Sequence, residues 1–325
     1  MSKITTVSGS PPLLHEGFVV PAFVAAAGER AAMRFVEFFT ANIRNPNTRR
    51  AYGRAVGDFF GWCEQHELSL AQLQPVHVAA YVEQLGQTRS APTVKQHLAG
   101  IRMLFDWLVI GQVMPTNPAA SVRGPKHVVE IGKTPVLSAE EVRAVLDAID
   151  VDTEIGLRDR ALIALLLYTF ARIGAALRMR GEDVFSQERR LWARLHEKGG
   201  KQHRMPCHHT LEVYLLDYME RTGLAAEPKR MLFPTRDRQT RELGERALTQ
   251  REALSMIGRR LKAAGINVPA GCHSFRATGI TVYMENGGTL ERAQKMAAHS
   301  SPRTTKLYDR TADKISQDEV ERILV

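Results

Sequence analysis

The chain has 325 residues, 44% hydrophobic and 24% charged, which is ordinary for a globular protein and long enough for two cores. A formal charge of +9 and a pI near 9.6 favour a polyanionic partner, because counterion release drives basic proteins onto nucleic acid. Three cysteines without a Cys-x-x-Cys pair argue against a disulfide framework, and the longest apolar run, residues 161–167, is too short to cross a bilayer. We therefore expect a cytoplasmic protein, associated with the nucleoid.

The first part of the chain divides into an arm and a helical domain. Residues 1–28 are rich in Ser, Pro, Val and Ala without periodicity, so we expect a flexible N-terminal arm. Between residues 29 and 122 apolar side chains recur every three or four positions, which predicts a domain made of helices. The expected helices cover residues 31–40, a longer segment with Asn47 as its N-cap, residues 76–85 and residues 93–110.

A linker of residues 123–136 separates this domain from a second one, residues 137–325. Proline and glycine gather at Pro115, Pro118, Gly124 and Pro125, which is typical of a boundary. In the second domain, Ser138 followed by Glu141 forms a capping box, and residues 157–169 predict a helix that is apolar on nearly all sides. Two strands, residues 191–197 and 202–207, are expected to form a hairpin around the turn 198–201. Further helices are predicted over residues 209–221, 250–264, 273–286, 290–298 and 317–324.

Several basic residues and one tyrosine of the second domain are candidates for chemistry. Arg172 follows the buried helix, Lys198 lies in a Lys-Gly-Gly turn, and His273 and Arg276 share a helix face. His299 and Tyr308 stand nine positions apart in His-Ser-Ser-Pro-Arg-Thr-Thr-Lys-Leu-Tyr. Taken one at a time, these residues are equally well explained as a helix-end salt bridge, a solvated turn lysine or a half-buried tyrosine. The crowded His203, Cys207, His208 and His209 lack a second pair of ligands, so we expect no metal site.

The order and spacing of these fragments resemble the tyrosine site-specific recombinase family, the phage-type and Xer-like integrases. The stretch His273-Ser-Phe-Arg276 is similar to the family's His-x-Leu-Arg box, and His299 to Tyr308 is similar to its Gly-His-Ser…Tyr box. The resemblance covers the second domain, and the helical first domain with its linker resembles the core-binding domain. It implies a mainly α fold with a small β-sheet, in which a helical domain and a mixed α/β catalytic domain form a two-domain, C-shaped DNA clamp.

The resemblance also implies a role for each candidate. Tyr308 would attack a DNA phosphodiester, giving a 3′-phosphotyrosyl link, while Arg172 and Arg276 hold the non-bridging oxygens. His273 would act as acid or base, His299 would donate a hydrogen bond to the phosphate, and Lys198 would protonate the leaving 5′-oxygen, with Lys201 as its competitor. No cofactor is expected, because the covalent link conserves the phosphodiester energy. Contact with double-stranded DNA is expected from a wider basic set: Arg44, Arg49, Arg50, Arg54, Lys95, Arg123, Lys126 and Lys201.

Two positions depart from the family pattern. Phe170 stands where a glycine is usual, and Ala175 stands where an acidic residue normally supports the arginine and histidine. The orientation of Arg172 or His273 is then left to another group, with Glu182, Asp183 and a water as candidates.

The function implied is strand exchange between two inverted-repeat sites by a homotetramer, with residues 317–324 docking into a neighbouring subunit and an accessory DNA-binding protein as a further partner. A mobile-element integrase, a transposon resolvase and a dimer resolvase all fit. The alternatives are a type IB topoisomerase and a DNA-binding accessory protein with a weakened site.

Overall fold

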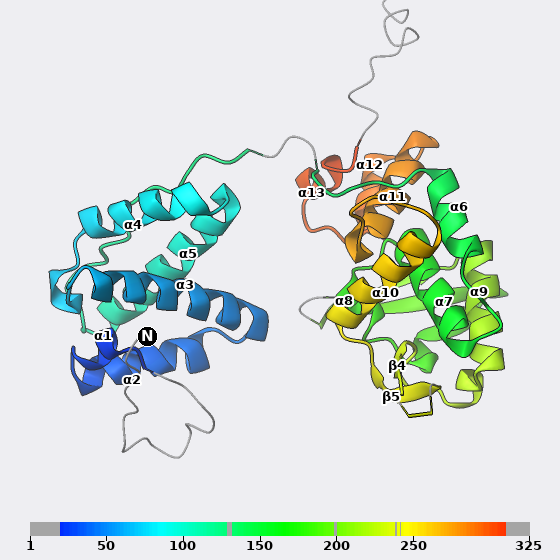
Figure 1. The fold of residues 1–325 in the computed structure, drawn as a ribbon, viewed down its shortest axis with the longest axis horizontal. Coiled ribbons are helices and arrows are strands. Elements are labelled where there is room, and N and C mark those ends of the chain that lie inside the picture. The colour runs from blue at the N-terminus through cyan, green and yellow to red at the C-terminus, as the bar shows by residue number, and fades with distance from the viewer. Residues whose placement is uncertain (1–19, 129–131, 198–199, 238, 241, 310–325) are drawn as a thin grey trace, which may run out of the picture. The chain divides into compact units, whose positions relative to one another are not determined.

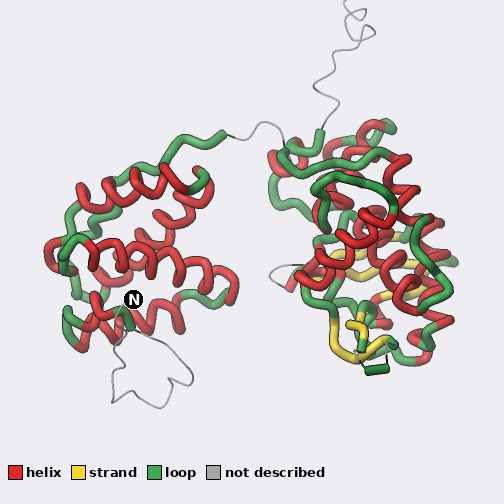
Figure 2. Tube along the Cα trace, viewed as in Figure 1, coloured by secondary structure: helices red, strands yellow, loops and turns green. Residues whose placement is uncertain are grey.

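The computed structural model describes residues 20–128, 132–197, 200–237, 239–240 and 242–309, and the chain forms two compact units. The N-terminal unit comprises residues 1–128 and the C-terminal unit residues 129–325. Helices dominate both units, and the strands of the described residues belong to the C-terminal unit (Figure 2). The prediction of a mainly helical chain with a small β-sheet is therefore confirmed. None of the described helices combines the length and apolar character that a membrane span needs.

The N-terminal unit is built from helices around an aromatic core (Figure 1). Its α-helices are α1 (Ala22–Ala25), α2 (Glu29–Glu37), α3 (Pro46–Gln65), α4 (Pro75–Thr88) and α5 (Ala91–Ile110). A π-helical turn, Phe38–Asn42, follows α2, and a 3-10 turn, Leu70–Gln72, precedes α4. The rings of Phe59, Phe60 and Phe105 are fully buried where α3 meets α5. Burial of such rings provides the main stabilisation of a bundle of this size.

The predicted cap of α3 is wrong by two residues. The side chain of Asn45, not that of Asn47, accepts hydrogen bonds from the backbone N–H groups of Asn47 and Thr48, at 3.0 and 3.2 Å. Pro46 then occupies the first helical position, where its missing N–H costs nothing. Asn45 is thus the residue whose oxygen satisfies the free donors of the first turn.

The C-terminal unit places one buried helix, α7 (Glu154–Tyr168), among the others (Figure 1). The capping box of α6 (Ala139–Asp147) forms as predicted, with Glu141 N–H donating to the Ser138 hydroxyl at 3.2 Å. The remaining helices are α8 (Ile173–Ala176), α9 (His209–Arg221), α10 (Gln250–Ala263), α11 (Cys272–Glu285), α12 (Leu290–Met296) and α13 (Pro302–Lys306). Within α7 the side chains from Ala161 to Leu166 have no exposed surface, which explains why this helix is apolar on all sides.

The C-terminal unit contains a three-stranded antiparallel sheet. Its order is β1 (Val184–Gln187), β2 (Arg190–His196) and β3 (Gln202–Pro206), so the predicted hairpin β2–β3 is confirmed and β1 extends it. The hairpin closes with the Glu197 N–H donating to the Lys201 carbonyl at 2.8 Å. A second sheet pairs β4 (Pro234–Arg236) with β5 (Leu243–Ala247) and was not predicted. Residues 1–19 of the predicted arm and the predicted helix 317–324 lie outside the described residues. The prediction is wrong for residues 20–28, because they contain α1 and bury Phe23 and Val24 in the core of the N-terminal unit.

Candidate active site

Five of the six predicted site residues lie in one cluster of the C-terminal unit. Arg172 is the N-cap of α8, directly after α7 ends, and His273 and Arg276 lie in the first turns of α11. His299 follows α12, and Tyr308 follows α13. Four separate segments therefore bring these side chains together. The sixth residue, Lys198, lies outside the described residues, although Glu197 and Lys201 on either side of it are described.

Backbone carbonyl groups hold the guanidinium of Arg276 in the buried part of the cluster. Its Nη1 donates to the carbonyl of Phe170, and its Nη2 donates to the carbonyl of Ala297 at 2.7 Å. The side chain is only 1% exposed, and its Nε is buried without an acceptor among the described residues. A charged donor of this kind is costly to leave unpaired in a folded protein, and the phenol of Tyr308, which interacts with the same guanidinium, is a polar group close to it.

Burial and then the nearby Arg172 lower the pKa of Arg276 to about 10, while the Tyr308 phenol and the Glu197 carboxylate oppose this shift. The guanidinium therefore keeps its charge at neutral pH.

His299 accepts a hydrogen bond from Arg276 and is neutral. The Arg276 Nη2 lies 2.6 Å from His299 Nε2, and because a guanidinium only donates, this nitrogen must carry the lone pair. Nδ1 then holds the proton and donates it to the buried Thr305 hydroxyl at 2.9 Å. Desolvation, followed by the charges of Arg276 and Arg172, lowers the pKa of His299 to about 3.

Tyr308 closes the cluster. Its ring stacks on the His299 ring with centroids 5.8 Å apart and an interplanar angle of 8°. Its backbone carbonyl accepts from the Thr281 hydroxyl of α11 at 3.0 Å, so the short helix α13 is tied to α11 at this point. The tyrosine is 9% exposed and packs with Phe170 and Ala297 in a small apolar cluster.

Arg172 is held by a carboxylate that the sequence analysis missed. Its Nη1 donates to Glu197 Oε2 at 2.7 Å, and its remaining contacts are two long ones to the Ala298 carbonyl, at 3.4 and 3.5 Å. Neither acidic candidate named from the sequence does this. Glu182 is exposed, and Asp183 accepts from His196 at 2.9 Å and from Arg194 at 3.4 Å.

His273 lies at the mouth of the cluster with part of its ring in solvent. Partial desolvation, and then the positive charges of Arg276 and Arg172, lower its pKa, so the imidazole is neutral near pH 7. A neutral imidazole can accept a proton, which is what a general base requires.

The unusual Phe170 occupies a backbone conformation that favours glycine. Its φ of +53° lies in the left-handed region, which explains why a glycine would be expected there. Its ring is nevertheless buried, and it packs against Gly279 of α11, where an added Cβ would lie 2.1 Å from the Leu167 carbonyl oxygen. The carbonyl of Phe170 accepts the hydrogen bond from Arg276.

Comparison with known proteins identifies the family. The phage integrase family matches residues 135–314, and the phage integrase N-terminal SAM-like domain matches residues 34–111. The first match alone covers more than half of the chain. The chain belongs to the phage integrase family. It is therefore a tyrosine recombinase, an enzyme that breaks and rejoins DNA.

Relatives and solved structures place the recombinase near Xer-type proteins. It is 28% identical to the tyrosine recombinase XerD of Pseudomonas putida over 274 residues, covering 82% of this chain and 87% of XerD. Among solved structures, XerH bound to palindromic difH substrate in a post-cleavage complex has a TM-score of 0.66 at 18% identity, covering 84% of this chain and 78% of XerH. A lambda integrase dimer bound to a COC′ core site also has a TM-score of 0.66, at 17% identity, covering 88% of this chain and 78% of that one. These two likenesses show a shared fold.

The basic residues predicted to contact DNA are mostly exposed in the recombinase. Arg49 differs, because its Nε and Nη2 both donate to the Ile43 carbonyl, at 3.1 and 2.8 Å, and so stabilise the turn before α3. The exposed members are Arg44, Arg50, Arg54, Lys95, Arg123, Lys126 and Lys201.

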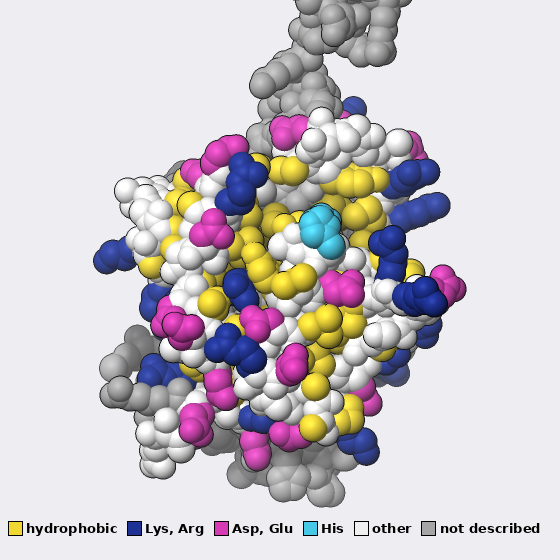
Figure 3. All heavy atoms as spheres, turned by 90° about the vertical axis from the view of Figure 1, so that its right-hand side faces the viewer, with side chains coloured by type: hydrophobic (Ala, Val, Ile, Leu, Met, Phe, Trp, Pro, Cys, Tyr) yellow, Lys and Arg dark blue, Asp and Glu magenta, His cyan; other side chains and the backbone are white. Residues whose placement is uncertain are grey.

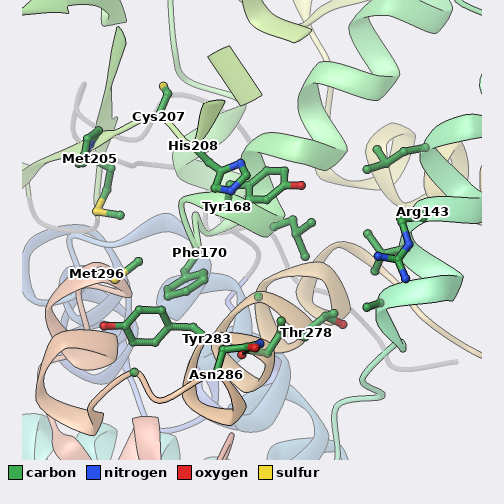
Figure 4. Close-up of a pocket in the computed structure, with 18 of the residues that line it drawn as sticks. Arg143, Tyr168, Phe170, Met205, Cys207, His208, Thr278, Tyr283, Asn286 and Met296 are labelled. Carbon is green, nitrogen blue, oxygen red and sulfur yellow. Dashed lines mark hydrogen bonds between the residues drawn. The ribbon is translucent and has the colours of Figure 1, made fainter. Parts of the chain in front are cut away.

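The C-terminal unit also contains an apolar hollow. Its volume is about 840 Å³, and it lies between α6, the end of α7, β3 and α11. Phe170 and Tyr283 form one wall and the stacked rings of Tyr168 and His208 another, with Arg143 at the rim (Figure 4). On a face of the same unit, apolar side chains gather beside a histidine (Figure 3). We call this hollow the apolar groove.

Proposed function

We propose that the recombinase cleaves one DNA strand by direct attack of the Tyr308 phenol oxygen on phosphorus. A bond forms between that oxygen and phosphorus, and the bond from phosphorus to the 5′-oxygen breaks. His273 accepts the phenol proton, and Lys198 gives a proton to the 5′-oxygen as it leaves. A 3′-phosphotyrosyl link and a free 5′-hydroxyl result, and the reverse reaction on a second strand exchanges the two sites.

The observation that carries this proposal is the unpaired Nε of Arg276 beside the tyrosine. It is a buried, charged donor for which no acceptor among the described residues meets hydrogen-bond geometry, and the phenol of Tyr308 interacts with the same guanidinium. A non-bridging phosphate oxygen is the acceptor that satisfies it, and a guanidinium gains most from such a bond because it is charge-assisted. Arg172, with 38% of its side chain exposed, would bind the second oxygen.

The neutral state of His299 changes its proposed role. Its Nε2 already accepts from Arg276, so this nitrogen has no proton to donate to a phosphate. In this arrangement His299 would act by orienting Arg276, and it would donate to the phosphate only after its proton moves from Nδ1 to Nε2.

Trapping on a nicked suicide substrate tests the chemistry. The parent protein should form a covalent protein–DNA adduct, because loss of the short 5′ fragment prevents religation. Tyr308→Phe should bind the same duplex and form no adduct, since only the nucleophilic oxygen is removed. Adduct formation by Tyr308→Phe would refute the assignment of the nucleophile.

We further propose that residues 29–122, within the N-terminal unit, are a core-binding domain that grips double-stranded DNA together with the catalytic domain, residues 137–325, to which the linker 123–136 joins it. Support comes from the exposed basic side chains on α3 and from the DNA in the complexes of lambda integrase and XerH. The double variant with Arg50→Ala and Arg54→Ala should bind DNA more weakly. The slope of log Kd against log[salt] should fall by about one to two, because up to two phosphate contacts are lost. Lys229→Ala, an exposed cation of the C-terminal unit, is the matched control and should leave the slope unchanged.

Strand exchange needs several copies of the chain, and we propose a homotetramer on two inverted-repeat sites. The segment from Gln317 to the end carries apolar Val320, Ile323 and Leu324, and the apolar groove is a surface of matching character. Docking of this segment into the groove of a neighbour would hold the tetramer together. Deleting residues 317–325 should weaken pairing of two sites in a mobility-shift assay while leaving single-site binding intact; equal loss of both would contradict subunit exchange.

The biological role would be that of a mobile-element integrase, a transposon resolvase or a dimer resolvase, with or without an accessory DNA-binding protein. Suicide substrates made from the inverted repeats that flank the gene distinguish a mobile-element site from a chromosomal one. Addition of host extract to the purified reaction shows whether an accessory protein is required.

A further inference from the structure

We infer that Glu197 is the positioning residue of Arg172 and takes the place of the carboxylate missing at Ala175. This inference rests on the proposed cleavage by Tyr308. Ala175 lies in α8, one turn after Arg172, and its methyl group is 1% exposed. The carboxylate comes instead from the end of β2, 25 residues further along the chain.

The orientation of Arg172 depends on this one strong contact. The bond from Nη1 to Glu197 is 2.7 Å long, whereas both contacts with the Ala298 carbonyl, at 3.4 and 3.5 Å, are near the limit of a hydrogen bond. Arg276 differs, because carbonyl groups of Phe170 and Ala297 and the ring of His299 all hold it. Loss of Glu197 would therefore release Arg172 and leave Arg276 in place.

Glu197 is placed beside the guanidinium rather than in the position of the substrate. Its side chain is 7% exposed, while 38% of the Arg172 side chain is open to solvent, so a phosphate would approach from the side away from the carboxylate. Glu197 engages Nη1, and Nε of Arg172 has no acceptor among the described residues. The edge formed by Nε and Nη2 can bind two oxygens at once.

The strand that carries Glu197 is itself anchored. The neighbouring His196 Nε2 lies 2.9 Å from Asp183, and the His196 carbonyl accepts from Arg178. The Glu197 N–H closes the hairpin on the Lys201 carbonyl at 2.8 Å. Asp183, one of the acids expected to support Arg172, therefore supports it only indirectly, because it holds the end of β2 next to Glu197. Because Lys198 follows Glu197 directly, the same contact joins the phosphate-binding arginine to the segment of the proposed general acid.

The test measures the rate of covalent adduct formation on a suicide substrate, with single-site DNA binding and thermal unfolding followed in parallel. Glu197→Gln keeps the size of the side chain and removes its charge, and it should slow cleavage about 10-fold, with Glu197→Ala slower by about 100-fold. Glu197→Asp, which retains the carboxylate, should recover part of the rate. DNA binding should not weaken, because a negative charge is being removed. Glu182→Gln removes an exposed carboxylate near the same sheet and should match the parent.

A double-mutant cycle separates positioning from a general structural role. In an Arg172→Ala background, Glu197→Gln should cost less than about twofold, because the group it acts through is gone. A full additional loss in that background would show that Glu197 acts elsewhere and would overturn the inference.

Two further outcomes would overturn it: unchanged cleavage by Glu197→Gln, or faster cleavage, which would make the carboxylate a block on the phosphate site. If the parent protein forms no adduct at all, the proposed reaction fails before the role of Glu197 is tested.

Discussion

The protonation state of His299 makes the sharpest prediction about stability. The imidazole is 8% exposed, accepts from Arg276 and donates to Thr305, so the folded protein has no room for a second proton. In the unfolded chain a histidine titrates near pH 6.5, whereas in the folded chain the pKa of His299 falls to about 3. Between these two values the unfolded state binds more protons, so stability is lost as pH falls.

The size of this stability loss at pH 5 is nearly independent of the pKa of His299 in the folded protein. With an unfolded pKa near 6.5 and any folded pKa below about 4, the linkage relation gives about 2 kcal/mol between pH 7.5 and pH 5. At pH 7.5 the contribution is already complete, because the unfolded histidine is itself neutral there. The slope should therefore appear between about pH 6.5 and pH 3, and not above pH 7.

Urea unfolding of the parent and of His299→Gln at pH 7.5 and pH 5 measures this effect. The chain has three tryptophans, and replacing Trp62 and Trp107 by Phe in both proteins leaves Trp192 as the reporter of the C-terminal unit. His299→Gln should be less stable at pH 7.5, and its loss on going to pH 5 should be smaller than that of the parent by about 2 kcal/mol.

Nitrogen-15 spectra of the histidine rings provide a direct check. The signal that disappears in His299→Gln should show a proton on Nδ1 and should not titrate above pH 5. A proton on Nε2, or titration of that ring near pH 6.5, would refute the arrangement with Arg276 as donor.

Three smaller predictions concern stability, each read from urea unfolding. Phe170→Gly should lower the unfolding free energy of the C-terminal unit by about 1–4 kcal/mol, because losing a buried phenyl ring costs about 3–5 kcal/mol and relief of the left-handed φ returns about 1–2 kcal/mol. Gly279→Ala should destabilise the same unit by about 1–3 kcal/mol or more, since the new Cβ would lie 2.1 Å from the Leu167 carbonyl oxygen; a neutral result would mean that α7 and α11 separate easily. Asn45→Ala should cost the N-terminal unit about 1 kcal/mol, whereas Asn47→Ala should change it by less than about 0.5 kcal/mol; the reverse order would restore Asn47 as the cap.

Local structure was predictable from the sequence. The Ser138–Glu141 capping box, the β2–β3 hairpin and the buried helix α7 each depend on residues within a few positions of one another. The misplaced cap of α3 shows the limit of that reasoning. Two asparagines flank one proline, and only the backbone geometry decides which side chain meets the first turn.

Contacts between distant segments were not predictable in the same way. Glu197 was read as the last residue of a strand, because nothing near it in the sequence indicates a partner 25 positions earlier. The sequence held a partial signal for the role of Glu197. The acid position after Arg172 holds alanine, and Glu197 is the carboxylate adjoining the Lys-Gly-Gly turn, which the resemblance places beside the same phosphate. The state of His299 was out of reach, since its neutrality follows from a guanidinium that lies 23 residues away.

The charges of the described site explain why the arginines need a carboxylate partner at all. Desolvation lowers the pKa of both His273 and His299, so near pH 7 the fixed charges in the cluster are those of Arg172, Arg276 and Glu197, one net positive charge. A phosphodiester carries one negative charge, which this balance neutralises. In the proposed reaction, negative charge grows on the non-bridging and leaving oxygens as the phenol attacks. Without Glu197, the two arginines would bind the DNA phosphate more strongly in the ground state. They would not stabilise the leaving oxygen any better, and uniform binding does not accelerate the chemical step. In the proposed reaction the extra positive charge is most useful at the 5′-oxygen, which Lys198 would protonate.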